Sequence, residues 1–164
     1  MTSSFFRFGA NDAVLPHSPQ YVPLPRFKDN LREFISLLYN ESSEYYHSPE
    51  RTKVIFITPP PVDDGARAQE LAERDPPLVP DREFENTHKY AKAVEDVGKE
   101  LGIPVADSWT AIWEAAGKHK SGLKKYLPDG LHLNAASYQV SKPQRKVFGP
   151  ISPSCRLYMI SFWT

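Results

Sequence analysis

Apolar residues along the first sixty positions switch between strand-like and helix-like spacing. Ser4–Phe8 is a short, largely aromatic run that predicts a strand. Lys53–Thr58 is a nearly continuous apolar run, typical of a parallel strand that is buried on both faces. Between the two runs, apolar side chains recur at the spacing of one helical face, which predicts an amphipathic helix that frays near Asn40. Its apolar positions are Phe27, Leu31, Phe34, Ile35 and Leu38.

The same alternation continues toward the C-terminus. Asp81 is the expected N-cap of a second helix that runs to about Leu101, where Gly102 would end it. Ile103–Asp107 predicts a third strand. The charged, proline-bearing stretch from Val62 to Pro80 predicts an irregular loop, a candidate lid or substrate loop.

Two shorter helices are expected after the third strand. Ser108 can cap a helix from Trp109 to about Gly117, and Asn134 can begin a last one. Alternating strands and helices of these lengths predict an α/β fold, a parallel sheet joined by right-handed crossovers. Ligands of such sheets bind at the carboxyl ends of the strands. The Gly9–Asp12 turn and the Pro59–Pro61 run both follow predicted strands at that edge.

The pattern changes after residue 140. We expect residues 1–140 to form one domain and residues 141–164 an irregular tail, because three of the chain's 16 prolines interrupt that tail. Its apolar run, Tyr158–Trp163, is either a partner-binding strand or an aggregation-prone segment, and the second interpretation is favoured.

Composition excludes several classes of function. The chain has 164 residues, 20 basic and 20 acidic, without a long run of one charge, which argues against nucleic-acid partners and polybasic membrane binding. Its one cysteine, Cys155, fits a reducing compartment. The sequence has no run of about 18 apolar residues and no leader pattern. These features predict a cytoplasmic protein without a membrane span; nothing in the sequence indicates a cofactor or an oligomeric state.

Two constellations carry candidate chemistry. Asp129 and His132, three residues apart on a Pro/Gly-punctuated loop, can form the Asp–His pair that serves as the base in hydrolytic triads. Asn11 follows Gly9 after the first strand and can donate its amide to a developing oxyanion. Taken singly, each has a plainer interpretation, a turn for Gly9–Asp12 and a surface histidine for His132. A metal site formed by Asp12, His17, Asp129 and His132 is disfavoured, because their spacing matches no common metal site.

Together and in this order, the two motifs resemble blocks of the GDSL-type esterases, or SGNH hydrolases. Phe8–Ala13 resembles their third block and Asp129–His132 their fifth, and Gly9–Phe27 with the Val54–Pro61 strand is similar to the isoamyl acetate-hydrolysing branch. The resemblance covers about Phe6 to Val140. It implies a three-layer flavodoxin-like fold, here without its first strands, and a Ser–His–Asp mechanism on small esters of short acyl chains.

The resemblance also implies a role for each motif residue. His132 would be the general base and then the general acid, Asp129 would orient it, Asn11 would donate to the oxyanion, and Gly9 would shape that hole. The family's nucleophile lies in a Gly-Asp-Ser block upstream of the Asn block, and this chain has eight residues before Gly9.

The serines of this sequence do not replace that nucleophile. Ser3 and Ser4 lie at the amino end of their strand, roughly 15 Å or more from Asn11 at about 3.3 Å per residue. Thr58, Ser108 and Ser137 lack the Gly-Asp-Ser setting. We therefore expect negligible esterase activity from this chain alone, as for a truncated product.

Three functions follow from these expectations: an ester hydrolase by descent, a non-catalytic binding or regulatory protein, and an unstable truncated product. The third gains support because the strand at Ser4–Phe8 would have an exposed edge without its neighbours.

Overall fold

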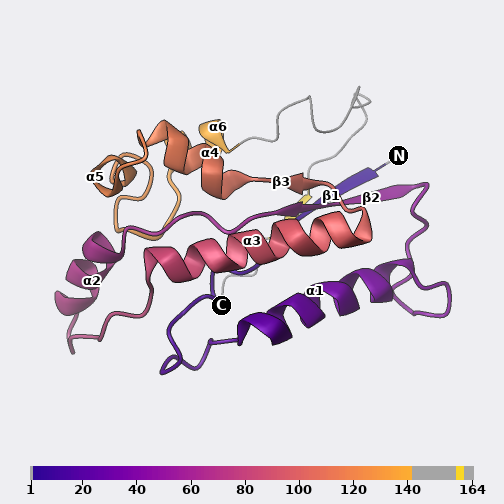
Figure 1. Ribbon diagram of the computed structural model, residues 1–164, viewed down its shortest axis with the longest axis horizontal. Helices are drawn as coiled ribbons and strands as arrows, with labels where there is room; N and C mark the ends of the chain where they lie inside the picture. Colours follow the sequence, from indigo (N-terminus) through magenta and orange to yellow (C-terminus); the bar gives the residue numbers. More distant parts are fainter. Residues whose placement is uncertain (1, 142–157, 161–164) are drawn as a thin grey trace.

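The structure, a computed structural model, describes residues 2–141 and 158–160. In this part of the chain four parallel strands form one sheet in the order β3-β2-β1-β4. The strands are β1 Thr2–Arg7, β2 Thr52–Ile57, β3 Val105–Ala106 and β4 Tyr158–Ile160 (Figure 1). The helices are α1 Leu24–Tyr39, α2 Asp64–Ala72, α3 Phe84–Leu101, α4 Ser108–Ala115, α5 Lys120–Leu123 and α6 Ala135–Val140.

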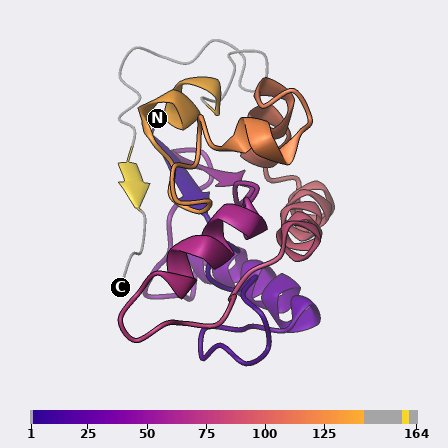
Figure 2. The ribbon, with the colours of Figure 1, turned by 90° about the vertical axis from the view of Figure 1, so that its left-hand side faces the viewer.

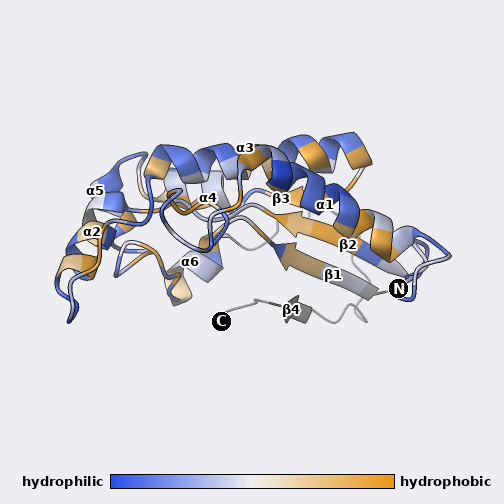
Figure 3. Ribbon diagram, turned by 90° about the horizontal axis from the view of Figure 1, so that it is seen from below, coloured by the Kyte–Doolittle hydropathy of each residue, from blue (hydrophilic) through white to orange (hydrophobic). Residues whose placement is uncertain are grey.

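Helices α1 and α3 cover one face of the sheet. The predicted apolar stripe of α1 is confirmed, since Phe27, Leu31 and Ile35 are buried there. They pack in one cluster with Phe56 of β2 and Tyr90 of α3. Figure 3 shows the hydrophilic faces of both helices turned away from the strands. Burial of this stripe, rather than helix propensity, is what holds α1 in place.

The other face of the sheet is covered at its carboxyl end by α6. Because side chains alternate along a strand, Phe5 and Arg7 of β1 point away from the α1 side. The Arg7 guanidinium lies 5.8 Å from the ring centroid of Tyr138 in α6. Helix α6 packs in turn with α4 and α5 (Figure 2). The predicted α/β class, with helices on both faces of a parallel sheet, is thus confirmed.

Helix α2 contradicts the irregular loop expected from Val62 to Pro80. Asp63 caps its N-terminus, accepting a hydrogen bond from the Ala66 amide at 3.1 Å. Several charged residues of this stretch form ion pairs on α2 instead, among them Asp64 with Lys120 and Glu70 with Arg74.

Two predicted caps are also wrong. Helix α3 begins after Glu83, and the carboxylate of Asp81 binds arginines instead of the helix. Helix α4 is capped by Asp107, which accepts from the Thr110 amide at 3.0 Å, and Ser108 is the first helical residue. The predicted stop at Gly102 is confirmed, since it adopts a left-handed conformation with φ +66°.

Strand β4 pairs with the outer edge of β1. The register joins Ser4 to Tyr158 and Phe6 to Ile160. The exposed edge expected for Ser4–Phe8 is therefore paired over three of its residues. The remaining tail residues, 142–157 and 161–164, lie outside the described part of the chain, and the domain boundary near residue 140 stays a prediction.

No helix within the described ranges is long and apolar enough to cross a membrane.

Candidate active site

Three segments meet beyond the carboxyl ends of the strands. The loop that follows β1 carries Gly9 and Asn11, and the connection after β2 leads into α2. The third segment, residues 124–134, connects α5 to α6 and carries Asp129 and His132. Figure 3 shows α2, α5 and α6 on the side toward which the strand arrows point. The fold thus brings the two sequence motifs to one rim, as the strand order predicts.

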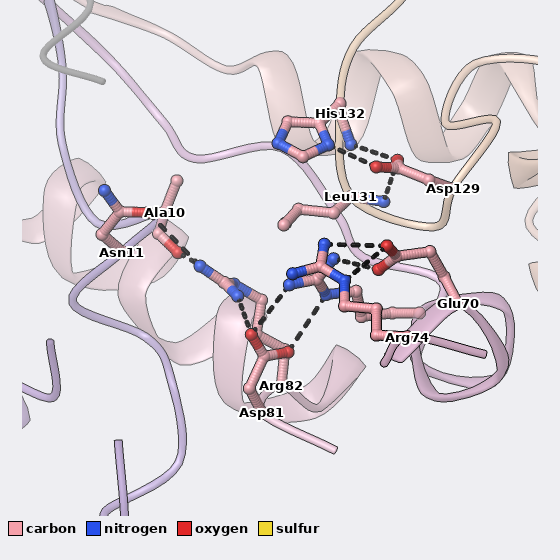
Figure 4. Close-up of polar contacts among 10 residues, drawn as sticks. Ala10, Asn11, Glu70, Arg74, Asp81, Arg82, Asp129, Leu131 and His132 are labelled. Carbon is pink, nitrogen blue, oxygen red and sulfur yellow. Dashed lines mark hydrogen bonds and ion pairs between the residues drawn. The ribbon is translucent and has the colours of Figure 1, made fainter. Parts of the chain in front are cut away.

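Asp129 and His132 form the pair that the sequence predicts. The Nδ1 atom of His132 is hydrogen-bonded to Oδ2 of Asp129 (Figure 4). The other carboxylate oxygen, Oδ1, accepts from the backbone amides of Leu131 at 3.0 Å and His132 at 2.7 Å. Both oxygens are thereby fixed by neighbours within three residues, so the local turn itself orients the imidazole.

These hydrogen bonds also control the charge of Asp129. Partial burial by itself raises the pKa of Asp129, but the amide and ring hydrogen bonds from His132 and the amide of Leu131 outweigh it, and the pKa is lowered to about 2. The carboxylate is therefore ionised at neutral pH. An ionised Asp on Nδ1 stabilises an imidazolium and keeps the ring in one orientation.

Gly130 allows this loop to lie directly on α2. Its φ is +80°, and a Cβ at this position would lie 2.5 Å from the backbone nitrogen of Arg67 and from the carbonyl oxygen of Asp63. The Asp63 amide donates to the Gly130 carbonyl at 2.8 Å. The loop of the Asp–His pair thus packs against the first turn of α2 and is hydrogen-bonded to the residue that caps it.

The second motif forms a compact turn after β1. Gly9, with φ +96°, is buried, and a Cβ there would lie 3.1 Å from the Phe27 ring and 3.2 Å from Cγ of Pro59. Its amide donates to the Asp12 carboxylate at 3.1 Å. Since that N–H is engaged, Gly9 shapes the turn by close packing, and Asn11 is the residue of the motif whose side chain can donate.

The Asn11 side chain is held by an arginine 71 residues away. The Arg82 guanidinium donates to Oδ1 of Asn11 at 3.3 Å and to the Ala10 carbonyl at 3.4 Å. Arg82 is almost fully buried and is paired with Asp81. In Figure 4 the Asn11 amide nitrogen lies on the side away from Arg82, and the His132 ring extends toward the side on which Asn11 lies.

Asp81 links Arg82 to α2. Its two oxygens accept from Nε and Nη2 of Arg67 at 3.2 and 3.0 Å, a bidentate pair. Arg67 is buried and also binds Glu70, which in turn pairs with Arg74 (Figure 4). Burial lowers the pKa of Arg67, but the carboxylates around it outweigh that effect and its pKa is raised. Asp81 contributes most to the rise, followed by Glu70 and Asp129.

Sequence inspection missed this arginine network. Arg67, Asp81 and Arg82 lie in a stretch expected to be irregular or to begin a helix, where single charges carry no pattern. The signal that could have found α2 is Asp63, a good N-cap residue, followed by the helix formers from Ala66 to Leu71. Nothing local indicates that Arg82 reaches Asn11.

The hydroxyl groups of Thr58, Ser108 and Ser137 are engaged in hydrogen bonds within the fold. Ser108 is 1% exposed and donates to the Thr58 carbonyl, whose own hydroxyl donates to Asp107. Ser137, 0% exposed, donates to the Tyr126 carbonyl. A serine nucleophile must be able to reach both base and substrate, and these three hydroxyl groups are committed to backbone or side-chain partners.

Residues 2–141 and 158–160 hold no group of three or more His, Cys, Asp or Glu side chains that could bind an ion.

Residues 5–140 match the GDSL-like Lipase/Acylhydrolase family. The chain belongs to this family. A GDSL esterase/lipase of Arabidopsis thaliana is 36% identical over 136 residues, covering 81% of this chain and 52% of that protein. An isoamyl acetate-hydrolyzing esterase 1 homolog of Rattus norvegicus is 33% identical over 129 residues, covering 77% and 47%. This GDSL-family chain thus spans about half the length of the curated relatives it matches.

Two solved structures share this fold. A lipase/acylhydrolase from Enterococcus faecalis superposes with a TM-score of 0.54 at 27% identity, covering 82% of this chain and 54% of that one. A variant of an acetyl-xylooligosaccharide esterase from Geobacillus gives 0.59 at 15% identity, covering 91% and 60%, and supports the fold alone. The family resemblance inferred from the two motifs is confirmed.

Proposed function

We propose that this chain carries the general base and an oxyanion donor of a carboxylic-ester hydrolase that acts on short acyl esters. The observation that carries the proposal is the Asp129–His132 pair, with Asp129 ionised and bound through both oxygens. It stands at the same sheet rim as Asn11, in a chain of the GDSL-like family. The relatives named as esterases support the reaction class.

The roles follow from general triad chemistry. His132 would take the proton of a serine hydroxyl as it attacks the ester carbonyl, and would return that proton to the leaving alcohol. Asp129 would hold the imidazole and stabilise its protonated form. Asn11 would donate from its amide nitrogen to the oxygen that becomes negative in the tetrahedral intermediate. Water would then release the acid from the acyl-enzyme by the same base.

The nucleophile in this proposal comes from outside the described residues. Thr58, Ser108 and Ser137 are buried and engaged, so they support no attack on a substrate. Loss of the nucleophile from a triad lowers turnover by about 10⁶. We therefore expect the 164-residue chain alone to hydrolyse esters at the background rate.

Hydrolysis of p-nitrophenyl acetate tests both statements. The chain alone and its His132→Ala variant should give the same slow rate. A longer form that adds a Gly-Asp-Ser strand segment before Met1 should turn over in a manner that His132→Ala abolishes. The control is His47→Ala, an exposed histidine before β2, at the amino ends of the strands, which should leave the rate unchanged.

Each arm can fail in an informative way. His132-dependent turnover by the chain alone would place a working nucleophile within these 164 residues. Full activity of the longer form after His132→Ala would reject the base role. A longer form that folds, binds short esters and does not hydrolyse them would favour the alternative function, a non-catalytic binding protein. The engaged hydroxyls are the observation that supports that alternative.

A further inference from the structure

The Asn11 carboxamide has two possible orientations that differ by a half-turn of its end group. One places the NH₂ group toward a neighbour and the other places the carbonyl oxygen there. Only the first orientation allows Asn11 to donate to an oxyanion. A neighbouring group must therefore fix the first orientation before substrate binds, because electrostatic stabilisation of an oxyanion depends on donors that are already oriented.

Arg82 fixes the orientation of the Asn11 carboxamide. A guanidinium is a donor only, so the oxygen of Asn11 must face it and the nitrogen must face away. The observed contact, Nη2 of Arg82 to Oδ1 of Asn11 at 3.3 Å, has this polarity. A flipped amide would set its own NH₂ against the cation, and the contact would become repulsive. The second donation, to the Ala10 carbonyl, binds the guanidinium to the turn itself and not only to the side chain.

Arg82 is in turn held from both sides. Asp81 pairs with Arg82 and accepts the bidentate bond from Arg67. The Asp81 carbonyl also accepts from the Leu15 amide at 2.8 Å, which ties the Asp81 backbone to the end of the Asn11 turn. With a side chain that is 5% exposed, Arg82 has little room to adopt another rotamer.

The same framework reaches the base. Arg67 anchors Asp81 through its side chain and lies against Gly130 through its backbone, so α2 contacts both the Asp81–Arg82 pair and the Asp129–His132 loop. We infer that Arg82 is a positioning residue that presets the Asn11 carboxamide with its oxygen toward the guanidinium and its nitrogen free to donate on the opposite side, and that the pair between Asp81 and Arg67 of α2 keeps Arg82 in that position. The catalytic value of this orientation rests on the proposed function, whereas the orientation itself does not.

Solution NMR of the 164-residue chain tests the orientation without any activity. The test variant is Arg82→Lys, because a single ammonium group cannot make all three contacts of the planar guanidinium, to Asp81, Ala10 and Asn11. We expect the side-chain amide signals of Asn11 to shift in Arg82→Lys. The matched control is Arg32→Lys, which alters another bidentate pair, between α1 and Glu100 of α3, and should leave those signals in place.

A wild-type measurement keeps the test decisive if Arg82→Lys does not fold. The guanidinium protons of Arg82 should give separate signals that exchange slowly with water, while those of the exposed Arg51 average and exchange fast. Averaged, fast-exchanging Arg82 protons would overturn the inference. So would unmoved Asn11 signals in a folded Arg82→Lys variant.

Kinetics of the longer, nucleophile-bearing form tests the consequence. Arg82→Lys should lower kcat by up to about 100-fold with little change in KM, since an oxyanion donor acts in the transition state. In an Asn11→Ala background the same substitution should have little further effect, because Arg82 acts through Asn11. Equal losses in both backgrounds would contradict positioning through Asn11. Shifted Asn11 signals without any esterase activity would reject the proposed function and leave the orientation standing.

Discussion

The backbone of Gly130 lies directly against the backbone of Arg67, so close that a Cβ at position 130 would be 2.5 Å from the Arg67 nitrogen. This contact joins the loop of the Asp–His pair to the first turn of α2. Arg67 continues the connection with its side chain, through Asp81, toward Arg82 and Asn11. His132 and Asn11, the proposed base and oxyanion donor, lie 121 positions apart in the chain (132 less 11) and are both connected to α2.

Gly130→Ala should destabilise the fold more than an ordinary left-handed glycine would explain. A positive φ costs an alanine about 1–2 kcal/mol, and the clash with Arg67 and Asp63 adds to it, so we expect a loss of at least about 2 kcal/mol. Urea unfolding measures it. Gly102→Ala is the control, since φ there is +66° with no atom within 4 Å of the added Cβ. Equal losses of unfolding free energy in the two variants would show that α2 shifts to accommodate the added Cβ at little cost.

Asp129 should make stability depend on pH in the acid range. Its folded pKa, about 2, lies below the unfolded value of about 3.9, so its contribution is complete above pH about 4 and disappears as the pH falls toward 2. Because the group is partly exposed, we expect that contribution to be about 1–2 kcal/mol at neutral pH. Urea unfolding of wild type and Asp129→Asn, from pH 7 to pH 2, should show a difference that closes in this window.

The control for that series is Asp96→Asn, whose carboxylate pairs with Lys28 and is 63% exposed. It should stay within about 0.5 kcal/mol of wild type, as exposed pairs usually do. A difference between wild type and Asp129→Asn that stays constant down to pH 2 would contradict the low pKa of Asp129.

Asp81→Asn should be strongly destabilising. It leaves the buried guanidinium groups of Arg67 and Arg82 without the carboxylate that lies between them. Breaking a buried ion pair from one side costs about 3–5 kcal/mol, and Glu70 offsets part of this at Arg67. The thermal midpoint should fall by several degrees more than in Glu95→Gln, which removes the exposed pair with Lys92. Matching midpoints would mean that water reaches the two arginines.

Removal of the chain after residue 157 should promote self-association. It takes away β4 and leaves Ser4–Phe6 of β1 without the strand that pairs with them. An unpaired, largely apolar strand edge is a template for another chain. Size-exclusion chromatography with light scattering should detect larger species for the shortened chain than for the full one. A shortened chain that keeps the same mass distribution would show that β4 does not protect this edge.

The sequence by itself determined the elements whose patterns are local. The apolar stripe of α1, the buried run of β2 and the left-handed stop at Gly102 each depend on residues within a few positions, and each is found as predicted. The Asp129–His132 pair belongs to the same class, because a turn of four residues contains both partners and the amides that fix them.

Only the tertiary structure decided the role of Asp81, the contact of Arg82 with Asn11 and the pairing of β4. Asp81 resembles a helix cap in sequence, but two arginines approach it in space and outcompete the helix amides for its oxygens. Arg82 meets Asn11 across 71 positions, and β4 meets β1 from the other end of the chain. Charges and strand edges carry no periodic signature of their distant partners. The partners of a charged residue or a strand edge depend on the path of the whole chain. That path is set by the burial of the apolar faces that the local patterns predict.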